Sequence, residues 1–303
     1  MKDFETDLAA TAGRVEQALV ELLGGPDAPC GRLGDAMRYT VLGGGKRLRP
    51  YIVMSGAGLF GVPETRAMRT GCALELLHCY SLVHDDLPSM DDDDLRRGKP
   101  TLHRAFDEAT AILAGDALLT LAFEIMSAPG THPDGNIRAA LVLELSRAAG
   151  AAGMAEGQMR DLEAEGRFAG DGCPLVLSED EVLALQARKT GALFRFAAEA
   201  SAILGGADAE DRERLSRYGA ALGRAFQIAD DLLDEEAETE QLGKAAGKDR
   251  AAGKATLPAV IGVEAARERL SEAVAEAHAA LRDYGDCAGP LLAAAEFAAV
   301  RRK

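Results

Sequence analysis

The sequence contains no tryptophan, and aromatic residues make up only 5% of its 303 positions. Valine, isoleucine and tyrosine are sparse as well, and no long stretch alternates apolar with polar residues, as a half-buried strand does. Alanine, leucine, glutamate and arginine fill most long segments, and this composition favours helix. The sequence therefore predicts an all-α protein with more than ten helices and no strands.

Basic residues are also in short supply, because 34 lysines and arginines face 49 aspartates and glutamates and leave a net charge of −15. A general nucleic-acid binder needs a basic surface that displaces counterions from phosphates, so we expect no nucleic-acid partner. A small phosphorylated substrate is still compatible with this charge, provided that cations gather locally or a metal ion bridges phosphate to carboxylate.

Neither the cysteines nor the apolar runs indicate a disulfide framework, a metal site or a membrane-spanning segment. The five cysteines are scattered, odd in number and form no Cys-x-x-Cys pair, so they indicate neither a disulfide framework nor a zinc site. The N-terminus has acids where a signal peptide needs bases. Because no uninterrupted apolar run reaches 18 residues, we expect no stable membrane insertion and a cytoplasmic location.

Hydrophobic periodicity and the positions of glycine and proline predict where the helices lie. Ser178 and Glu181 have the spacing of a capping box at the start of one of them. Residues 235–253 are polar and rich in glycine and lysine, which predicts a mobile loop, and no linker marks a boundary inside a single domain of residues 1–303. The expected helices are 4–23, 33–42, 50–60, 64–86, 106–126, 136–153, 154–165, 178–204, 208–234, 256–263, 265–284 and 289–303.

Six aspartates follow the apolar run 74–83, and two arginines follow the aspartates. Carboxylates this dense repel each other unless a cation lies between them, and Mg²⁺ prefers hard oxygen ligands completed by water and phosphate. The pattern fits a metal–phosphate site at the mouth of an apolar cavity, although a bare acidic run is more often a solvated loop. The residues are Asp85, Asp86, Asp91, Asp92, Asp93 and Asp94, then Arg96 and Arg97.

A second apolar helix ends in the same way, with Asp230 lying 145 positions after Asp85. Asp230 and Asp234 are one turn apart on one helix face, Gln227 shares that face, and Asp231 lies beside them. Like charges at this spacing destabilise an isolated helix, so the arrangement indicates a bound cation. We expect the two helices to face each other across a cavity and to share a Mg²⁺ cluster.

Candidate phosphate-binding cations are spread along the chain. Any single one is more often a solvated surface residue, but together they fit a site for two diphosphates. They are Lys46 and Arg49 after a triple glycine, Arg96 and Arg97 after the aspartates, Lys189 beside Thr190, and Lys244, Lys248 and Lys254.

These motifs resemble those of the trans-isoprenyl diphosphate synthases, or polyprenyl synthetase family, over nearly the whole chain. Two extra residues in the first motif, Pro88 and Ser89, are similar to the bacterial-type farnesyl diphosphate synthases. The resemblance implies an isoprenoid-synthase-type helical bundle around a central cavity, and a homodimer. The matching motifs are GGKRLRP at 44–50, the aspartates at 85–91 with Arg96-Arg97-Gly98, Gly157-Gln158 with Asp161, Lys189-Thr190, Phe226-Gln227, Asp230 to Asp234, and Gly253-Lys254.

The resemblance also implies roles for many of the matching residues. Asp85, Asp91 and Asp230 would ligate Mg²⁺, with three ions per active site. Asp86, Asp231 and Asp234 complete the acidic set that we count as catalytic, together with Lys189, Thr190 and Gln227. The allylic diphosphate would be held by Arg96, Lys189, Thr190, Gln227, Lys244 and Lys254, and isopentenyl diphosphate by Lys46, Arg49, His78 and Arg97.

The implied reaction is a Mg²⁺-dependent head-to-tail condensation of isopentenyl diphosphate with an allylic diphosphate. Mg²⁺ would make the allylic diphosphate a leaving group, and oxygens of Thr190 and Gln227 would stabilise the allylic cation. The double bond of isopentenyl diphosphate would then attack this cation, and a proton would be lost. The residues 235–253 and the basic end Arg301 to Lys303 are candidates for a closing lid.

The length of the product is predicted from the helix that precedes Asp85. Tyr80 lies five residues before Asp85, and in the bacterial-type farnesyl synthases an aromatic residue there accompanies a C15 product. A helical turn rises about 5.4 Å, similar to one isoprene unit, so the large Tyr80, followed by the small Ser81, would stop growth early. We expect farnesyl diphosphate from dimethylallyl or geranyl diphosphate, with simple core packing as the plainer explanation of Tyr80.

Several alternatives stay open. A geranylgeranyl diphosphate synthase (C20) differs only in product length, whereas a class I terpene cyclase lacks the GGKRLRP loop. A non-catalytic partner subunit usually loses one or both aspartate motifs, and a metal-dependent phosphohydrolase rests only on the dipeptide His84-Asp85. His103 receives no role, and the run from Asp92 to Asp94 is expected to be peripheral.

Overall fold

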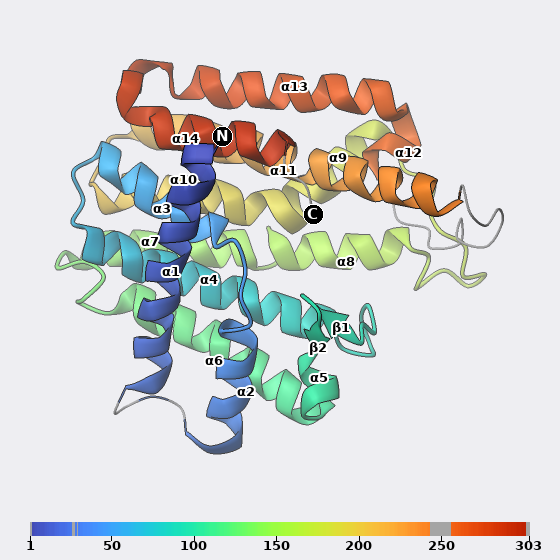
Figure 1. Cartoon of the computed structure of the whole chain (residues 1–303), viewed down its shortest axis with the longest axis horizontal. Helices are drawn as coiled ribbons and strands as arrows, with labels where there is room; N and C mark the ends of the chain where they lie inside the picture. The colour runs from blue at the N-terminus through green and yellow to red at the C-terminus, as the bar shows by residue number, and fades with distance from the viewer. Residues whose placement is uncertain (1, 26–27, 29, 243–255, 301–303) are drawn as a thin grey trace. The chain divides into compact units, whose positions relative to one another are not determined.

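Helices make up almost all of the chain that the structure describes, which confirms the expected all-α fold (Figure 1). The computed structural model describes residues 2–25, 28, 30–242 and 256–300. The helices are α1 (Lys2–Gly24), α2 (Gly31–Val41), α3 (Leu48–Leu59), α4 (Glu64–Asp85), α5 (Leu102–Ala105), α6 (Glu108–Ser127), α7 (Gly135–Ala149), α8 (Met154–Ala164), α9 (Glu179–Gln186), the π-helix η1 (Ala187–Gly191), α10 (Ala192–Leu204), α11 (Ala209–Leu242), α12 (Leu257–Ile261), α13 (Val263–Ala280), the 3₁₀ helix η2 (Arg282–Ala288) and α14 (Gly289–Val300).

A short hairpin interrupts the helices after the first acidic motif, so the expectation that the chain has no strands is wrong here. Strand β1 (Leu95–Arg96) pairs antiparallel with β2 (Lys99–Pro100). The turn residues Arg97 and Gly98 both have positive φ, 52° and 75°, as a type I′ turn requires. Strands of two residues are too short to show an alternating pattern, which explains why the sequence did not predict them.

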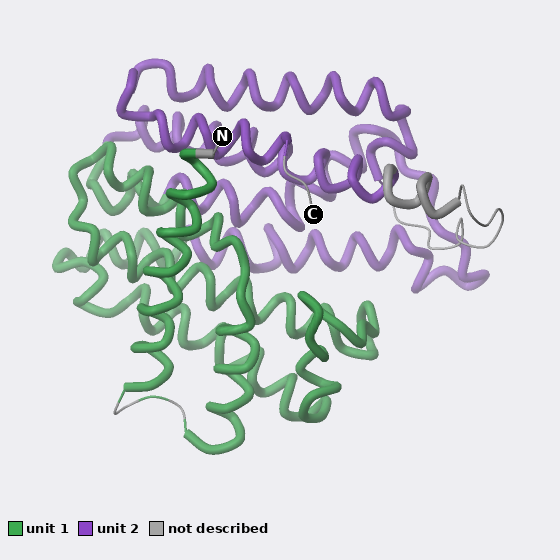
Figure 2. The backbone as a smooth tube through the Cα atoms, viewed as in Figure 1, with its two compact units in different colours: residues 1–143, 200–207 green, residues 144–199, 208–303 purple. Residues whose placement is uncertain are grey.

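The chain divides into two compact units (Figure 2). Unit 1 comprises residues 1–143 and 200–207, and unit 2 comprises residues 144–199 and 208–303. Helices α7 and α10 each contribute residues to both units. The expected single domain of residues 1–303 stays a prediction.

Helix α4 is the central element of unit 1, where it contacts α1, α2, α3 and α6. Residues 70–77 of this helix are all buried, as the apolar run in the sequence predicts. Gly71 lets α3 approach closely, because a Cβ at this position would lie 3.2 Å from the Cα of Pro50. The helix ends at Asp85, three residues before Pro88, so the aspartates leave the core at one end of the helix.

A buried ion pair fixes the basic loop that precedes α3 to the middle of α4. Nη1 of Arg47 donates to Oε1 of Glu75 at 2.7 Å, and these side chains are only 1% and 3% exposed. Nη2 of Arg47 also donates to the carbonyl of Val41 at 2.6 Å. The position of the loop therefore depends on one charge pair that water does not screen.

Helix α11 is the corresponding centre of unit 2, where it contacts η1, α13 and α14. The expected loop from Glu235 is wrong in its first part, because α11 continues to Leu242. No glycine or proline interrupts the sequence between these residues, and the helix ends just before Gly243. Residues 243–255 lie outside the described part of the chain, as do Arg301 to Lys303.

The segment predicted as one helix over 178–204 begins with a capping box, as expected. The side chain of Ser178 accepts from the backbone N–H of Glu181, whose carboxylate accepts from the backbone N–H of Ser178. The segment then passes through the π-helix η1, which the sequence did not predict. Single π-turns of this kind occur frequently at functional sites.

Helix α6 is long and apolar enough to cross a membrane by length and composition alone. In unit 1 this helix packs on α4, and 44% of its most apolar 18-residue stretch is buried. The core helix of a soluble protein passes the same test, so the absence of membrane insertion stays a prediction.

We expect Glu75→Gln to destabilise the protein by about 3–5 kcal/mol, because it leaves the Arg47 guanidinium buried without a counter-charge. Urea unfolding followed by circular dichroism measures this loss. Glu64→Gln is the matched control, since Glu64 pairs with Arg14 on the surface, with side chains 62% and 50% exposed, and its loss should cost less than about 1 kcal/mol. Equal losses in the two variants would contradict the importance of the buried pair.

Candidate active site

The end of α4 brings Asp85 and Asp91 together. The backbone N–H of Asp91 donates to the carbonyl of Asp85 at 2.9 Å, and Met90 donates to Leu87 at 2.8 Å. The chain therefore folds back after the helix, and the two inserted residues 88–89 lie in the exposed bend. Both aspartates are partly exposed. Two such carboxylates are the number that Mg²⁺ commonly takes from a protein when substrate phosphates and water complete its shell.

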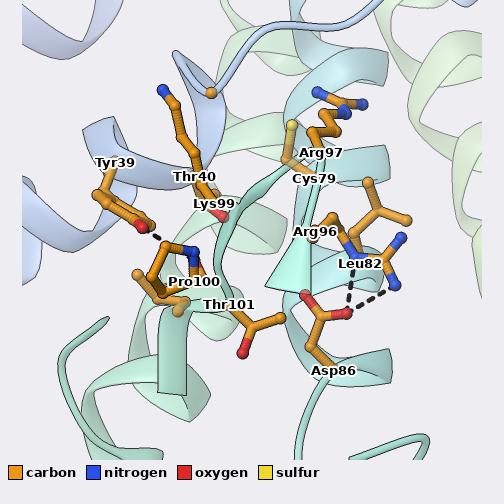
Figure 3. Close-up of a pocket in the computed structure, with 12 residues that line it drawn as sticks. Tyr39, Thr40, Cys79, Leu82, Asp86, Arg96, Arg97, Lys99, Pro100 and Thr101 are labelled. Carbon is orange, nitrogen blue, oxygen red and sulfur yellow. Dashed lines mark hydrogen bonds and ion pairs between the residues drawn. The ribbon is translucent and has the colours of Figure 1, made fainter. Parts of the chain in front are cut away.

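Asp86, in contrast, points inward and is only 3% exposed. Its Oδ1 accepts from both Nε and Nη2 of Arg96 at 2.6 Å, as Figure 3 shows. Burial raises the pKa of Asp86, and the charge of Arg96 opposes this shift. The side chain thus positions an arginine and does not face solvent.

The last three aspartates of the first motif are paired with other arginines. Asp94 and Asp92 lie 2.5 Å and 3.7 Å from Arg104, and Asp93 lies 3.5 Å from Arg96. These contacts agree with a peripheral position. His103, for which no role was expected, is buried, with its Nδ1 3.3 Å from the hydroxyl of Thr101.

The glycine loop and the second arginine of the hairpin form a cationic set in unit 1. Nη1 of Arg97 donates to the carbonyl of Gly44, and a Cβ at Gly45 would lie 2.7 Å from the same nitrogen. Burial, and then the charges of Arg49 and Arg97, hold the pKa of His78 well below its usual value, so this imidazole is neutral at pH 7. The charges of Arg49 and Arg97 therefore both act on His78, and Lys46 follows the glycines directly.

A pocket beside this set is lined by Arg96, Arg97, Lys99 and Asp86 among others (Figure 3). Both arginines of the sequence motif reach it, although one is held by Asp86 and the other by the glycine loop. This difference in partner supports separate roles for the two arginines.

Tyr80 is half-buried on α4 and contacts the ring of His84 one turn later. Their ring centroids are 5.7 Å apart in an edge-to-face arrangement. His84 in turn lies 3.1 Å from the carbonyl of Ile112 through Nε2, and it fills the space that a Cβ at Gly115 would need. Burial raises the pKa of Tyr80 to about 12, so the phenol is neutral. The neighbouring Ser81 donates to the carbonyl of His78 at 2.9 Å.

In unit 2, Lys189 and Thr190 lie on the π-helix η1, which is pressed between two helices. A Cβ at Gly157 of α8 would lie 2.2 Å from the backbone nitrogen of Lys189. On the other side, a Cβ at Gly223 of α11 would lie 2.8 Å from the Cα of Gly191. Asp161, one turn after Gly157, forms an ion pair with the ammonium of Lys189. Lys189 is thereby fixed by backbone contact and by charge.

A chain of hydrogen bonds continues from Thr190 along α11. The hydroxyl of Thr190 donates to Oε1 of Gln227 at 2.7 Å, and Nε2 of Gln227 donates to Oδ1 of Asp231 at 2.9 Å. Oδ2 of Asp231 accepts from Nε2 of Gln186 at 2.7 Å and from the backbone N–H of Leu257 at 2.9 Å. Burial raises the pKa of Asp231 in spite of these donors.

The aspartates of the second motif thus differ in burial, as those of the first motif do. Asp230 is half-buried and Asp234 is exposed, whereas Asp231 is only 5% exposed. Within the described residues no group of three or more His, Cys, Asp or Glu side chains is close enough to hold a metal ion unaided. Mg²⁺ does not require such a group, so Asp85, Asp91 and Asp230 fit it as single carboxylate ligands. Lys244, Lys248 and Lys254 lie outside the described residues.

Sequence reasoning gave no role to three residues that shape unit 2, namely Gly157, Asp161 and Gln186. The spacing of four between Gly157 and Asp161 places them on one helix face, which was the available signal. Their partner Lys189 is 28 residues from Asp161, and Gln186 is 45 residues from Asp231, so no local pattern shows these contacts.

Comparison with known proteins gives one consistent family. The model of the polyprenyl synthetase family matches residues 31–287. The chain is 43% identical over 283 residues to farnesyl diphosphate synthase of Geobacillus stearothermophilus, covering 92% of this chain and 91% of that protein. It is 39% identical over 300 residues to geranylgeranyl pyrophosphate synthase 4 of Arabidopsis thaliana, covering 99% of this chain and 78% of that protein. The crystal structure of an FPP/GFPP synthase from Zymomonas mobilis is similar with a TM-score of 0.86 and 42% identity, over 97% of this chain and 98% of that one.

We expect Gly157→Ala to reduce kcat at least tenfold and to destabilise the protein by about 1–3 kcal/mol, because the added methyl group must push α8 away from Lys189. Steady-state kinetics and urea unfolding measure the two effects. Gly13→Ala in α1 is the control, since its Cβ would meet nothing within 4 Å and should stabilise the helix by up to about 1 kcal/mol. Normal activity in Gly157→Ala would show that this close contact does not position Lys189.

Proposed function

Because this chain belongs to the polyprenyl synthetase family, we propose that it condenses isopentenyl diphosphate with dimethylallyl or geranyl diphosphate to give farnesyl diphosphate (C15) and diphosphate. The broader activity, a trans-prenyl diphosphate synthase, follows from the family itself, and the product length is the finer part of the proposal. The observation that carries it is that unit 1 holds two distinct sets, the carboxylates Asp85 and Asp91 and the cations around Arg97.

The cationic set in unit 1 suits a diphosphate that binds without a metal ion. Burial and the charges of Arg49 and Arg97 keep His78 neutral by lowering its pKa. The absence of a Cβ at Gly45 leaves room for the guanidinium of Arg97. Arginine offers a planar set of donors that matches phosphate oxygens. We assign Lys46, Arg49, His78 and Arg97 to isopentenyl diphosphate, which must keep its diphosphate during the reaction.

The residues of unit 2 suit the allylic substrate, which loses its diphosphate. Mg²⁺, when bound, supplies the charge that makes this diphosphate a leaving group. We assign Lys189, held by Asp161, to the same diphosphate, and the oxygens of the hydrogen-bonded pair Thr190 and Gln227 to stabilisation of the allylic cation. We also assign Arg96, which Asp86 keeps in place, to the allylic diphosphate. Lys244 and Lys254 are further proposed contacts outside the described residues.

Product length is the point at which the relatives differ. One similar protein is named a farnesyl diphosphate synthase and another a geranylgeranyl pyrophosphate synthase, so C20 is the alternative product. Tyr80 favours C15, because it is a bulky side chain one turn before Asp85 and His84 supports its ring.

We also propose a cytoplasmic homodimer without membrane insertion. The support for the homodimer is the exposure of two large apolar side chains of α6, Ile112 and Leu113, which are 44% and 58% exposed. A second copy of the chain would cover such side chains, whose exposure to water is unfavourable.

An elongation assay tests the proposed reaction. We expect purified protein with Mg²⁺ and radiolabelled isopentenyl diphosphate to convert dimethylallyl and geranyl diphosphates into a C15 product, and to elongate farnesyl diphosphate at least ten times more slowly, because a closed cavity rejects the longer chain. Chromatography by chain length gives the result. Rapid conversion of farnesyl diphosphate to C20 would favour the alternative, and no elongation of any allylic substrate would refute the proposed reaction.

Tyr80→Ala should shift the product from C15 to C20 or longer, because removing the ring opens space of about one isoprene unit below Asp85. Tyr80→Phe is the matched control, since it keeps the ring and removes only the hydroxyl, and it should retain a C15 product. The measurement is the ratio of C20 to C15 at saturating isopentenyl diphosphate. An unchanged ratio in Tyr80→Ala would show that this side chain does not limit growth.

A further inference from the structure

Asp231 is the buried aspartate of the second motif, and both of its carboxylate oxygens accept hydrogen bonds. Gln227 donates to Oδ1, while Gln186 and the backbone N–H of Leu257 donate to Oδ2. An ionised carboxylate is an acceptor only, so it matches these donors fully. The donors come from α9, α11 and the start of α12, so one carboxylate joins these segments within unit 2.

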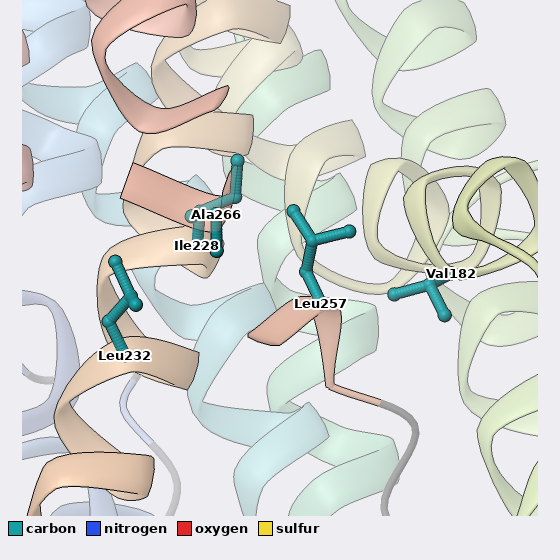
Figure 4. Close-up of a cluster of buried hydrophobic side chains, with 5 residues drawn as sticks. All are labelled: Val182, Ile228, Leu232, Leu257 and Ala266. Carbon is teal, nitrogen blue, oxygen red and sulfur yellow. The ribbon is translucent and has the colours of Figure 1, made fainter. Parts of the chain in front are cut away.

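The surroundings of Asp231 are apolar. Its neighbours in the sequence, Ile228 and Leu232, belong to a buried cluster with Val182, Leu257 and Ala266 (Figure 4). A carboxylate that left this environment to reach a metal ion would strand the donors of Gln186 and Leu257 away from water. An unsatisfied buried donor is costly, so the inward position is the stable one.

The contact between Asp231 and Gln227 also fixes which end of the amide faces Thr190. A carboxylate can accept only from the NH₂ group of Gln227, so the amide oxygen must point the other way, where it accepts from the hydroxyl of Thr190. Without this acceptor the amide could rotate by half a turn and direct its NH₂ group toward Thr190.

We propose that Asp231 is a positioning residue, not a metal ligand, which holds the amide oxygen of Gln227 toward Thr190 and ties α9 and α12 to α11. The inference rests on the proposed function in one respect, because it takes Thr190 and Gln227 to contact the reacting allylic group. Asp230 remains the metal ligand of the motif.

The first test is Asp231→Asn, which keeps the shape but replaces one acceptor by a donor that faces other donors. We expect kcat to fall about 10–100-fold while the Mg²⁺ concentration for half-maximal rate changes less than about threefold. We also expect the melting temperature in EDTA to fall by at least about 4 °C, because the hydrogen bonds need no metal. A raised Mg²⁺ requirement with an unchanged melting temperature in EDTA would overturn the proposal, because that is the result expected if Asp231 ligates Mg²⁺.

A double-mutant cycle tests whether Asp231 acts through Gln227. In a Gln227→Leu background, Asp231→Asn should lower kcat by less than about threefold, because the amide that it orients is already gone. Fully independent, multiplicative losses in kcat would overturn the positioning role. If the wild-type enzyme elongates no substrate, the proposed function fails, yet the melting temperatures in EDTA still test the buried contacts.

Gln186→Met gives a second test should Asp231→Asn not fold. It removes one donor to Asp231 without changing any residue assigned to substrate, and it should lower the melting temperature in EDTA by about 2–4 °C. Gln158→Met is the matched control, because the side-chain amide of Gln158 makes no hydrogen bond within the described part of the chain. Equal melting temperatures for the two variants would contradict the proposal.

Discussion

Carboxylates crowded at the end of an apolar helix repel each other, and this constraint shapes both acidic motifs. Each motif relieves part of the repulsion by turning its second aspartate inward. Asp86 accepts from Arg96, and Asp231 accepts from two glutamine amides and a backbone N–H. The proposed metal ligands Asp85, Asp91 and Asp230, in contrast, keep partial exposure to solvent. A run of like charges in the sequence therefore contains two kinds of residue with different tasks.

The cations depend on a second constraint, which is close approach of backbone segments. Glycine permits it at two of the cations: Gly45 lies against the guanidinium of Arg97, and Gly157 lies against the backbone of Lys189. A Cβ at Gly45 would lie 2.7 Å from Nη1 of Arg97, and a Cβ at Gly157 would lie 2.2 Å from the backbone nitrogen of Lys189. Both distances are too short for packed atoms, so the charged residue would have to move. The positions of these proposed phosphate-binding groups thus depend on the backbone around them as well as on their flexible side chains.

Much of this organisation could be predicted from the sequence, because the signals are local. Helical periodicity gave the long helices, the spacing of Ser178 and Glu181 gave a capping box, and the paired aspartates at two helix ends gave the motifs. The β1–β2 hairpin and the π-helix η1 were missed, since two-residue strands and one wide turn leave no periodic pattern.

The inward direction of Asp86 and Asp231 was beyond sequence reasoning for another reason. Adjacent aspartates look alike in a sequence, and the partners that distinguish them are remote, as with Gln186 and Leu257 for Asp231. Charge and polarity after Glu235 favour a loop, yet α11 extends to Leu242, because good helix formers continue to Gly243.

The central claim is that this protein transfers an allylic group to isopentenyl diphosphate and releases the diphosphate intact. The most direct measurement is the yield of inorganic diphosphate from geranyl diphosphate and Mg²⁺, with and without isopentenyl diphosphate. The account predicts one diphosphate for each isopentenyl unit incorporated, and almost none when isopentenyl diphosphate is absent. Release of inorganic phosphate, or of diphosphate with a cyclised hydrocarbon from geranyl diphosphate alone, would contradict it.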